Sequence, residues 1–143
     1  VSARSGQGLD QLRAAMEDVA AQVPPRRAVR YPRLPIDRVF SLKGHGTVVT
    51  GTLRDAPLAT ESELALYPTG RLTRVRSLQS HGAPARSAAP GARVALNLSG
   101  LEVADITRGQ VLAPPGVYRP TRLLDAQLEI LSSAKPLKDR APL

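Results

Sequence analysis

Two strand-like runs joined by a glycine-rich turn occupy the middle of this 143-residue chain. Residues 34–42 and 46–53 alternate in polarity or are rich in β-branched side chains, and Lys43–Gly46 between them carries the glycines of a tight turn. This pattern predicts a β-hairpin, and the other motifs of the chain can be placed around it.

Further short strands are expected on the C-terminal side of the hairpin, at 63–67, 72–79, 93–98 and 108–112, with turns or loops at 55–60, 68–70 and 80–91. In the run 93–98, Val94, Leu96 and Leu98 alternate with Arg93, Ala95 and Asn97, so the first three are core candidates. Short strands at intervals of roughly ten residues, separated by turn residues, predict a mainly β chain with a closed antiparallel β-barrel rather than βαβ units.

Both flanks of this β region have a different character. Leu9, Leu12, Met16 and Val19 recur at helical spacing, which predicts an amphipathic helix over 8–21 that ends at the two prolines following Val23. The stretch 24–33 is rich in proline and arginine and is interpreted as a linker. Residues 122–131 alternate again and predict one more strand, followed by polar and proline-rich sequence.

The charge of the chain favours a polyanionic partner. Twenty Lys and Arg face twelve Asp and Glu, for a net charge of +8, and arginine forks suit phosphates. The alternative is an arginine-rich surface without a ligand. Arg74 and Arg76 share a face of their expected strand and are candidate phosphate contacts. One Phe, three Tyr and no Trp argue against a base-stacking platform, so contacts to RNA are expected mainly at phosphate and sugar.

Several chemistries are not expected in this chain. It has no cysteine, no apolar run of the roughly 20 residues that a membrane span needs, and no export signal, which favours a cytoplasmic protein without a membrane or DNA partner. His45 and His81 lack metal-ligand spacing, so no metal site is expected. No GxxxxGK[ST] pattern precedes a helix, and we therefore expect neither catalytic residues nor GTP hydrolysis from this chain alone.

The motifs RLPIDRVFSLKGHGTVVTGTL and, further on, PGARVALNLSGLEVADITRGQVLAPPG resemble the second domain of translational GTPases of the elongation factor Tu superfamily. Within it, the chain is most similar to the selenocysteine-specific elongation factors. The resemblance implies four parts: the end of a GTPase domain (1–23), a linker (24–33), the domain II barrel (34–117) and the incomplete start of a domain III barrel (118–143). Ser2 and Ala3 resemble the loop that contacts the guanine base.

The same resemblance implies a pocket for the aminoacyl end of selenocysteinyl-tRNA. Elongation factor Tu has two acidic residues where this chain has Asp37 and Arg38, and a neutral residue where it has Arg93. Cationic donors favour an ionised selenol over a neutral hydroxyl. Asp37 is expected to orient an arginine or to accept from the aminoacyl amine, and Thr50 is a further candidate. The parent protein is expected to use GTP, GDP, Mg²⁺ and the ribosome.

Alternatives remain open from the sequence alone. Arg38 and Arg93 could form surface ion pairs, Asp37 could make a strand-end hydrogen bond, and Thr50 could only pack. The barrel could instead be a structural or ribosome-docking module, as in initiation-factor and sulfate-activation relatives. Alternation also places Arg38 on the same side as Ile36, which would turn it away from the pocket. A β-bulge near Asp37 would reconcile its position with the proposed role.

Overall fold

The computed structural model describes residues 1–24, 31–44 and 46–134. Most of the expected linker, His45 and residues 135–143 lie outside the described residues. The first element is the helix α1 (Leu9–Gln22), which follows Gly8 and has Asp10 in its first turn, where a negative charge is favourable. None of its residues is buried. The predicted amphipathic helix is therefore confirmed, and its apolar face is exposed.

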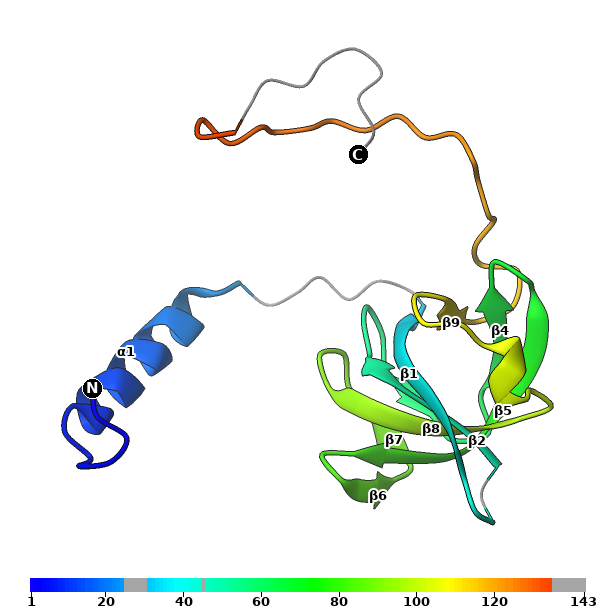
Figure 1. The fold of residues 1–143 in the computed structure, drawn as a ribbon, viewed down its shortest axis with the longest axis horizontal. Coiled ribbons are helices and arrows are strands. Elements are labelled where there is room, and N and C mark those ends of the chain that lie inside the picture. Colours follow the sequence, from blue (N-terminus) through cyan, green and yellow to red (C-terminus); the bar gives the residue numbers. More distant parts are fainter. Residues whose placement is uncertain (25–30, 45, 135–143) are drawn as a thin grey trace.

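Six antiparallel strands close into a barrel, as predicted (Figure 1). The predicted hairpin is present. Around the ring, each strand pairs with the next and the last returns to the first. In ring order the strands are β4 (Glu63–Tyr67), β9 (Val111–Ala113), β1 (Leu34–Leu42), β2 (Gly46–Thr52), β8 (Arg93–Ser99) and β5 (Arg71–Ser80).

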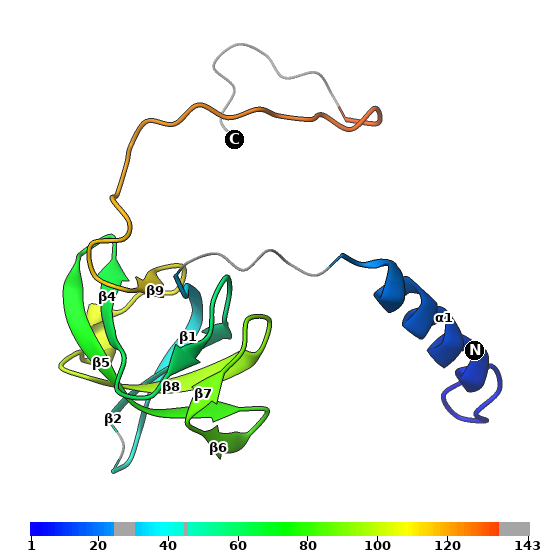
Figure 2. The same ribbon diagram turned by 180° about the vertical axis from the view of Figure 1, so that it is seen from behind.

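Short pairings decorate the ring in places where turns and loops were expected. β6 (Ala83–Ala85) extends β5 outside the ring, and β3 (Leu58–Ala59) pairs with β7 (Ser87–Ala88) in a two-stranded sheet. A 3-10 turn, η1 (Val103–Asp105), leads toward β9. In Figure 2, β4 and β9 lie near one end of the barrel and β6 near the other. The two ends of the barrel are therefore formed by different strands.

The core lies inside the ring and follows the predicted alternation. Val94, Leu96 and Leu98 of β8 are 2%, 0% and 3% exposed, and they pack with Val49 and other apolar side chains from every strand of the ring. Gly51 of β2 lies where the backbones of β1 and β2 come very close together. A Cβ built on Gly51 would lie 2.2 Å from the carbonyl oxygen of Pro35, so β1 approaches β2 more closely there than any side chain permits.

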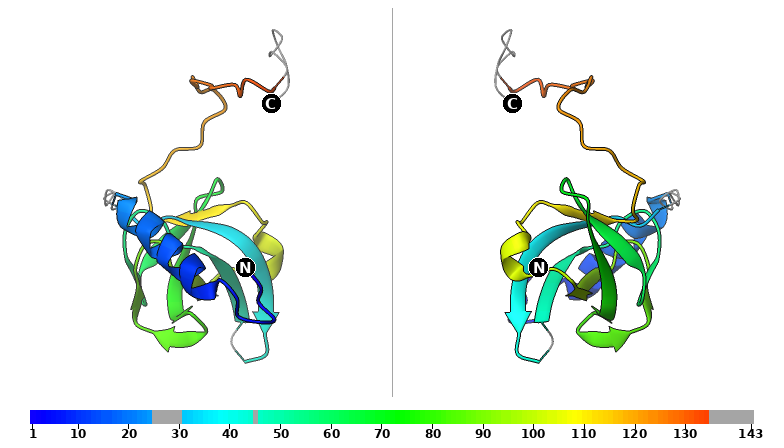
Figure 3. Two further views of the ribbon diagram at one scale, coloured as in Figure 1. Left: turned by 90° about the vertical axis from the view of Figure 1, so that its left-hand side faces the viewer. Right: turned by 90° about the vertical axis from the view of Figure 1, so that its right-hand side faces the viewer.

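The strand expected at 122–131 is not present. Those residues run as an exposed extended segment, which leads away from the barrel in Figure 3. Leu123, Leu124, Leu128, Ile130 and Leu131 are between 46% and 88% exposed. A strand needs a partner for its backbone groups, and this segment pairs with no described residue. In the described part of the chain, no helix is long and apolar enough to cross a membrane.

Candidate functional site

A β-bulge at Asp37 sets the geometry of the candidate site. Ile36 pairs with Gly51 and Arg38 with Thr50, so two steps along β1 match one step along β2. Asp37 is the extra residue. After the bulge, Val39 packs against the core while Arg38 and Phe40 are exposed. The structure thus contains the bulge that would reconcile the sequence pattern with an outward Arg38, and this bulge separates Arg38 from the inward face of Ile36.

Asp37, Arg93 and Thr50 form a closed hydrogen-bonded cluster on the outer face of the barrel. Arg93 donates through Nη1 to Asp37 Oδ2 at 2.5 Å and through Nη2 to Oδ1 at 3.1 Å. Thr50 Oγ1 donates to Asp37 Oδ1 at 2.6 Å and accepts from Arg93 Nη2 at 3.5 Å. Three strands, β1, β2 and β8, thus contribute one residue each. The pairing is bidentate, which fixes the plane of the guanidinium as well as its position.

Asp37 and Arg93 stabilise each other in their charged forms. The hydrogen bond from Arg93 does most to lower the pKa of Asp37 below its ordinary 3.8, with contributions from the Thr50 hydroxyl and from the charges of Arg93 and Arg38 against partial desolvation. The hydrogen bond to Asp37 in turn raises the pKa of Arg93. Both groups therefore stay ionised at neutral pH. Because the side chains of Asp37 and Arg93 are 36% and 55% exposed, water screens the pair and its contribution to stability is small.

Arg38 differs from Arg93 in having no carboxylate bound to it. It is exposed, opposite Thr50 on β2, and makes no ion pair or hydrogen bond with the described residues. It acts on Asp37 only through its charge. The site therefore contains one compensated guanidinium and one that is available to an anion.

Two adjoining depressions lie on the surface beside the cluster. Residues of β1, β2, β8 and β5 line them, together with the turn after β5. The larger has a volume of about 350 Å³ and is lined by Thr50, Gln79, His81, Gly82, Arg93, Val94 and Ala95. The smaller, about 80 Å³, is lined by Phe40, Leu42, Val48, Ser77, Gln79, Ala95 and Asn97. Gln79 and Ala95 border both, so the recess beside Arg93 and His81 continues into a slot that Phe40, Leu42 and Val48 line.

Sequence reasoning missed most residues of these depressions. The pairing aligns Phe40, Val48, Asn97 and Ser77 in one row across the four strands, and Arg38, Thr50, Ala95 and Gln79 in the next. The available signal was the alternation of β8: Ala95 and Asn97 had to share the outer face with Arg93. Phe40 and Gln79 could not be placed without the register of the outer strands.

The predicted phosphate contacts Arg74 and Arg76 lie on β5, and the structure separates their surroundings. Arg74 Nη2 lies 3.1 Å from Glu63 Oε1, and its Nη1 lies 4.0 Å from Glu61 Oε2, so two carboxylates compensate its charge. Arg76 is exposed at a second bulge, between Val75 and Ser77. That bulge turns Leu78 inward in place of Ser77, against the alternation expected from the sequence.

Ser2 and Ala3 lie in a compact loop before α1. The amide of Ser2 donates to the carbonyl of Gln7 at 2.9 Å, and Gly6 donates back to the carbonyl of Ser2 at 2.9 Å. The Ser2 hydroxyl accepts from the amide of Ser5 at 3.3 Å. The loop is thus closed on itself, and its predicted contact with a guanine base stays a prediction.

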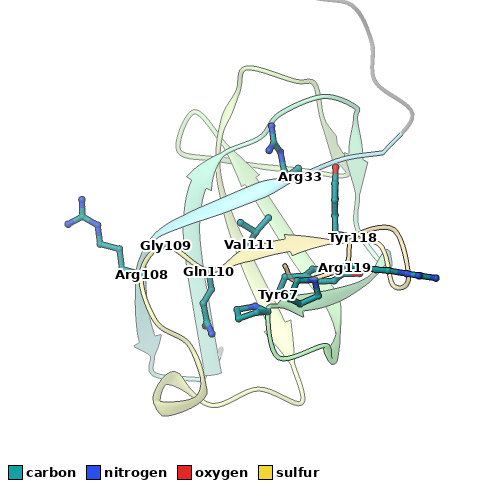
Figure 4. A pocket seen from close by; sticks show the side chains of 10 residues that line it. Arg33, Tyr67, Arg108, Gly109, Gln110, Val111, Tyr118 and Arg119 are labelled. Atoms are coloured by element: carbon teal, nitrogen blue, oxygen red, sulfur yellow. The ribbon is translucent and has the colours of Figure 1, made fainter. Parts of the chain in front are cut away.

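A larger pocket of about 440 Å³ lies at the β4 and β9 end of the barrel (Figure 4). Its tyrosines, Tyr67 and Tyr118, stand edge to face with ring centroids 5.9 Å apart, and Tyr67 donates to the carbonyl of Pro114 at 3.1 Å. Figure 4 shows Arg108 and Arg119 extending away on opposite sides. Neither makes an ion pair with a described residue, so this end of the barrel carries two uncompensated cations.

Comparison with known proteins identifies the class. No protein-family model matches the chain. It is 32% identical to translation elongation factor SelB from Methanococcus maripaludis in its apo form, with a TM-score of 0.74 over 80% of this chain and 25% of that one. A bacterial selenocysteine-specific elongation factor, EF-Sec, gives a TM-score of 0.74 at 30% identity over 80% of this chain and 20% of that one. The barrel is thus a translation elongation factor barrel.

Sequence relatives are more specific. The selenocysteine-specific elongation factor of Desulfomicrobium baculatum is 45% identical over 141 residues, 98% of this chain and 22% of the relative. That of Haemophilus influenzae is 34% identical over 143 residues, 99% of this chain and 22% of the relative. The resemblance to selenocysteine-specific elongation factors is therefore confirmed over nearly the whole chain, which spans about a fifth of the length of these relatives.

Proposed function

We propose that this barrel binds the aminoacyl end of selenocysteinyl-tRNA within a longer elongation factor that delivers this tRNA to the ribosome. Residues 1–23 would end its GTPase domain, 24–33 would be a linker, 34–117 would be domain II and 118–143 would begin domain III. GTP or GDP with Mg²⁺ would bind to the GTPase domain of the longer, cytoplasmic protein, with Ser2 and Ala3 near the guanine base. The relatives and the outer-face cluster support this proposal.

The single observation that carries the proposal is the bidentate Asp37–Arg93 pair, braced by Thr50 and bordered by a recess of about 350 Å³. A charge-assisted, preformed donor array costs a ligand little reorganisation. A selenolate is an anion near neutral pH, whereas a seryl hydroxyl is neutral, and hydrogen bonds to ionised acceptors are roughly twice as strong. Arg38, which no described carboxylate compensates, supplies the surplus positive charge that distinguishes the two.

The adjoining slot gives the rest of the aminoacyl end a place. Phe40, Leu42 and Val48 wall its apolar side, and the small side chain of Ala95 forms the floor between slot and recess. An aminoacylated nucleotide has the matching combination of a flat face and a polar, charged substituent. The α-amine of the aminoacyl ester would meet Asp37, whose carboxylate is ionised at neutral pH.

The test compares selenocysteinyl-tRNA and seryl-tRNA, built on the same tRNA, for binding to the full-length factor in a filter assay. We expect Arg93→Ala to reduce the preference for selenocysteinyl-tRNA by about tenfold, while Arg86→Ala, which removes an exposed arginine outside both depressions, leaves it unchanged. An unchanged preference in Arg93→Ala would show that the pocket assignment is wrong.

A second candidate function is a barrel without selenocysteine specificity. Elongation factor 1-alpha of Saccharolobus solfataricus is 33% identical over 94 residues, 66% of this chain and 22% of that relative. A similar sequence therefore also occurs in an elongation factor that is not named as selenocysteine-specific. In that case the wild-type factor would bind the two aminoacyl-tRNAs equally, and Arg93→Ala would weaken both to the same extent or neither.

A further inference from the structure

We propose that His81 is a specificity-determining residue, whose imidazole donates to the anionic side chain of the bound aminoacyl group. This inference rests on the proposed function and adds a residue that neither the motifs nor the relatives' names point to. Two observations support it: the place of His81 at the recess and the absence of net charge on the Asp37–Arg93 pair.

His81 lines the same recess as Thr50 of β2 and Arg93 of β8, and it reaches the recess from the end of β5. It follows the end of β5, whose Gln79 pairs with Ala95 and whose Ser80 pairs with Val94. The ring's Nδ1 lies 3.2 Å from Ser80 Oγ. The imidazole makes no other hydrogen bond with the described residues, so Nε2 is the nitrogen left for a ligand. Protonation of the ring makes both nitrogens donors, and Ser80 Oγ then accepts from Nδ1.

The backbone of His81 lies in the left-handed region. His81 and Gly82 form the two-residue turn between β5 and β6, with φ of 53° and 78° and with Ser80 paired to Ala83. Two-residue hairpin turns with positive φ at both positions favour Asn-Gly. Histidine is among the non-glycine residues that are enriched in the left-handed region, so His81 fits the first position of this turn.

Charge balance around the recess calls for another donor. Arg93 on β8 lines the recess together with His81, whereas Asp37 and Arg38 lie on β1, outside its lining. Asp37 occupies one N–H of each Nη atom of Arg93, so the pair has no net charge, although the remaining N–H groups of the guanidinium can still donate. Arg38 stands on the β1 side. An imidazole N–H of His81 would add a donor to the recess from the end of β5, on the side away from β1.

The experiment uses the full-length factor with selenocysteinyl- and seryl-tRNA on one tRNA. His81→Asn is the main variant, because asparagine suits the turn and should leave the thermal midpoint equal or higher. We expect the preference for selenocysteinyl-tRNA to fall about tenfold, with seryl-tRNA affinity unchanged. His81→Lys keeps a cation and should retain the preference. Arg86→Ala is the control, because Arg86 directly follows β6 and does not line the recess. Its preference for selenocysteinyl-tRNA should equal that of the wild type.

The outcomes distinguish this inference from the proposed function. A preference that is lost in Arg93→Ala but intact in His81→Asn would overturn the role of His81 and leave the proposed function standing. Equal binding of both aminoacyl-tRNAs by the wild-type factor would overturn both. A His81→Asn loss that His81→Lys does not restore would show that the imidazole acts by shape, which would also overturn the charge argument.

Discussion

Substitution of Gly51 by alanine tests the close approach of β1 and β2 that positions the cluster. The new Cβ would lie 2.2 Å from the carbonyl oxygen of Pro35 and 2.9 Å from Leu34 Cδ1. Real Cβ contacts essentially never fall under 3.0 Å, so the strands must separate by about 0.8 Å. The closest atom belongs to the backbone, and a change of rotamer cannot relieve the clash.

The magnitude follows from the surroundings. Leu34 is 1% exposed within the core, so a shift of β1 disturbs buried packing, at about 1–3 kcal/mol, and strains ladder hydrogen bonds worth about 1 kcal/mol each. Replacing glycine also restricts the unfolded chain, which returns about 0.4–1 kcal/mol. We expect a net loss of about 2 kcal/mol in the free energy of unfolding, and a thermal midpoint lower by roughly 10 °C.

The assay is urea and thermal unfolding of this 143-residue chain, followed by far-ultraviolet circular dichroism. Gly70→Ala is the comparison variant: Gly70 has φ of 75° and nothing within 4 Å of its Cβ, so only local strain of about 1–2 kcal/mol applies, and aminoacyl-tRNA binding should persist. Gly51→Ala should additionally weaken the Asp37–Arg93 pairing. A Gly51→Ala chain as stable as the wild type would refute the close approach.

Three further predictions concern the surface. Ala95→Leu, on the floor shared by recess and slot, should lower the affinity for both aminoacyl-tRNAs by tenfold or more in filter binding while the thermal midpoint changes little. Arg108→Ala and Arg119→Ala should each reduce the salt dependence of tRNA binding, measured as log K against log salt, without changing the selenocysteine preference. Because Asp37 and Asp105 have lowered pKa values in the fold, their stabilisation is complete above about pH 4 and is lost as pH falls further; urea unfolding of an Asp37→Asn, Asp105→Asn double variant should show a flatter acid limb.

The barrel was predictable because its information is local and periodic. Short runs with strand-like composition are separated by glycine-containing turns, and the sequence of β8 alternates, so the ring strands and the inward side chains of β8 could be predicted. The pairings of β3 with β7 and of β6 with β5 were not predictable, since two or three residues carry no detectable period. The run 122–131 failed for another reason: its pattern is that of a strand, and what it lacks is a partner among the described residues.

The pairing of Tyr67 with Tyr118 shows a limit of composition. Three tyrosines in the chain argued against an aromatic platform, yet two of them meet in one pocket although 51 positions separate them in the sequence. Composition counts aromatic rings but does not locate them. The meeting depends on the return of the chain past β9 to the end of β4, which is a property of the closed ring.

Two bulges determine which side chains face outward at the candidate site, and the sequence pointed to only one of them. Simple alternation places Arg38 with Ile36 and Ser77 with Val75, and in both strands one extra residue breaks the alternation, at Asp37 in β1 and at Arg76 in β5. The first bulge was anticipated only because a functional role demanded it, and the second had no such signal. The two bulged strands flank β2 and β8, and Arg38 and Arg76 are exposed on them. A bulge changes which side chains face a ligand while the core on the other face keeps its alternation, so the features that pattern analysis reads least well are those that shape this surface.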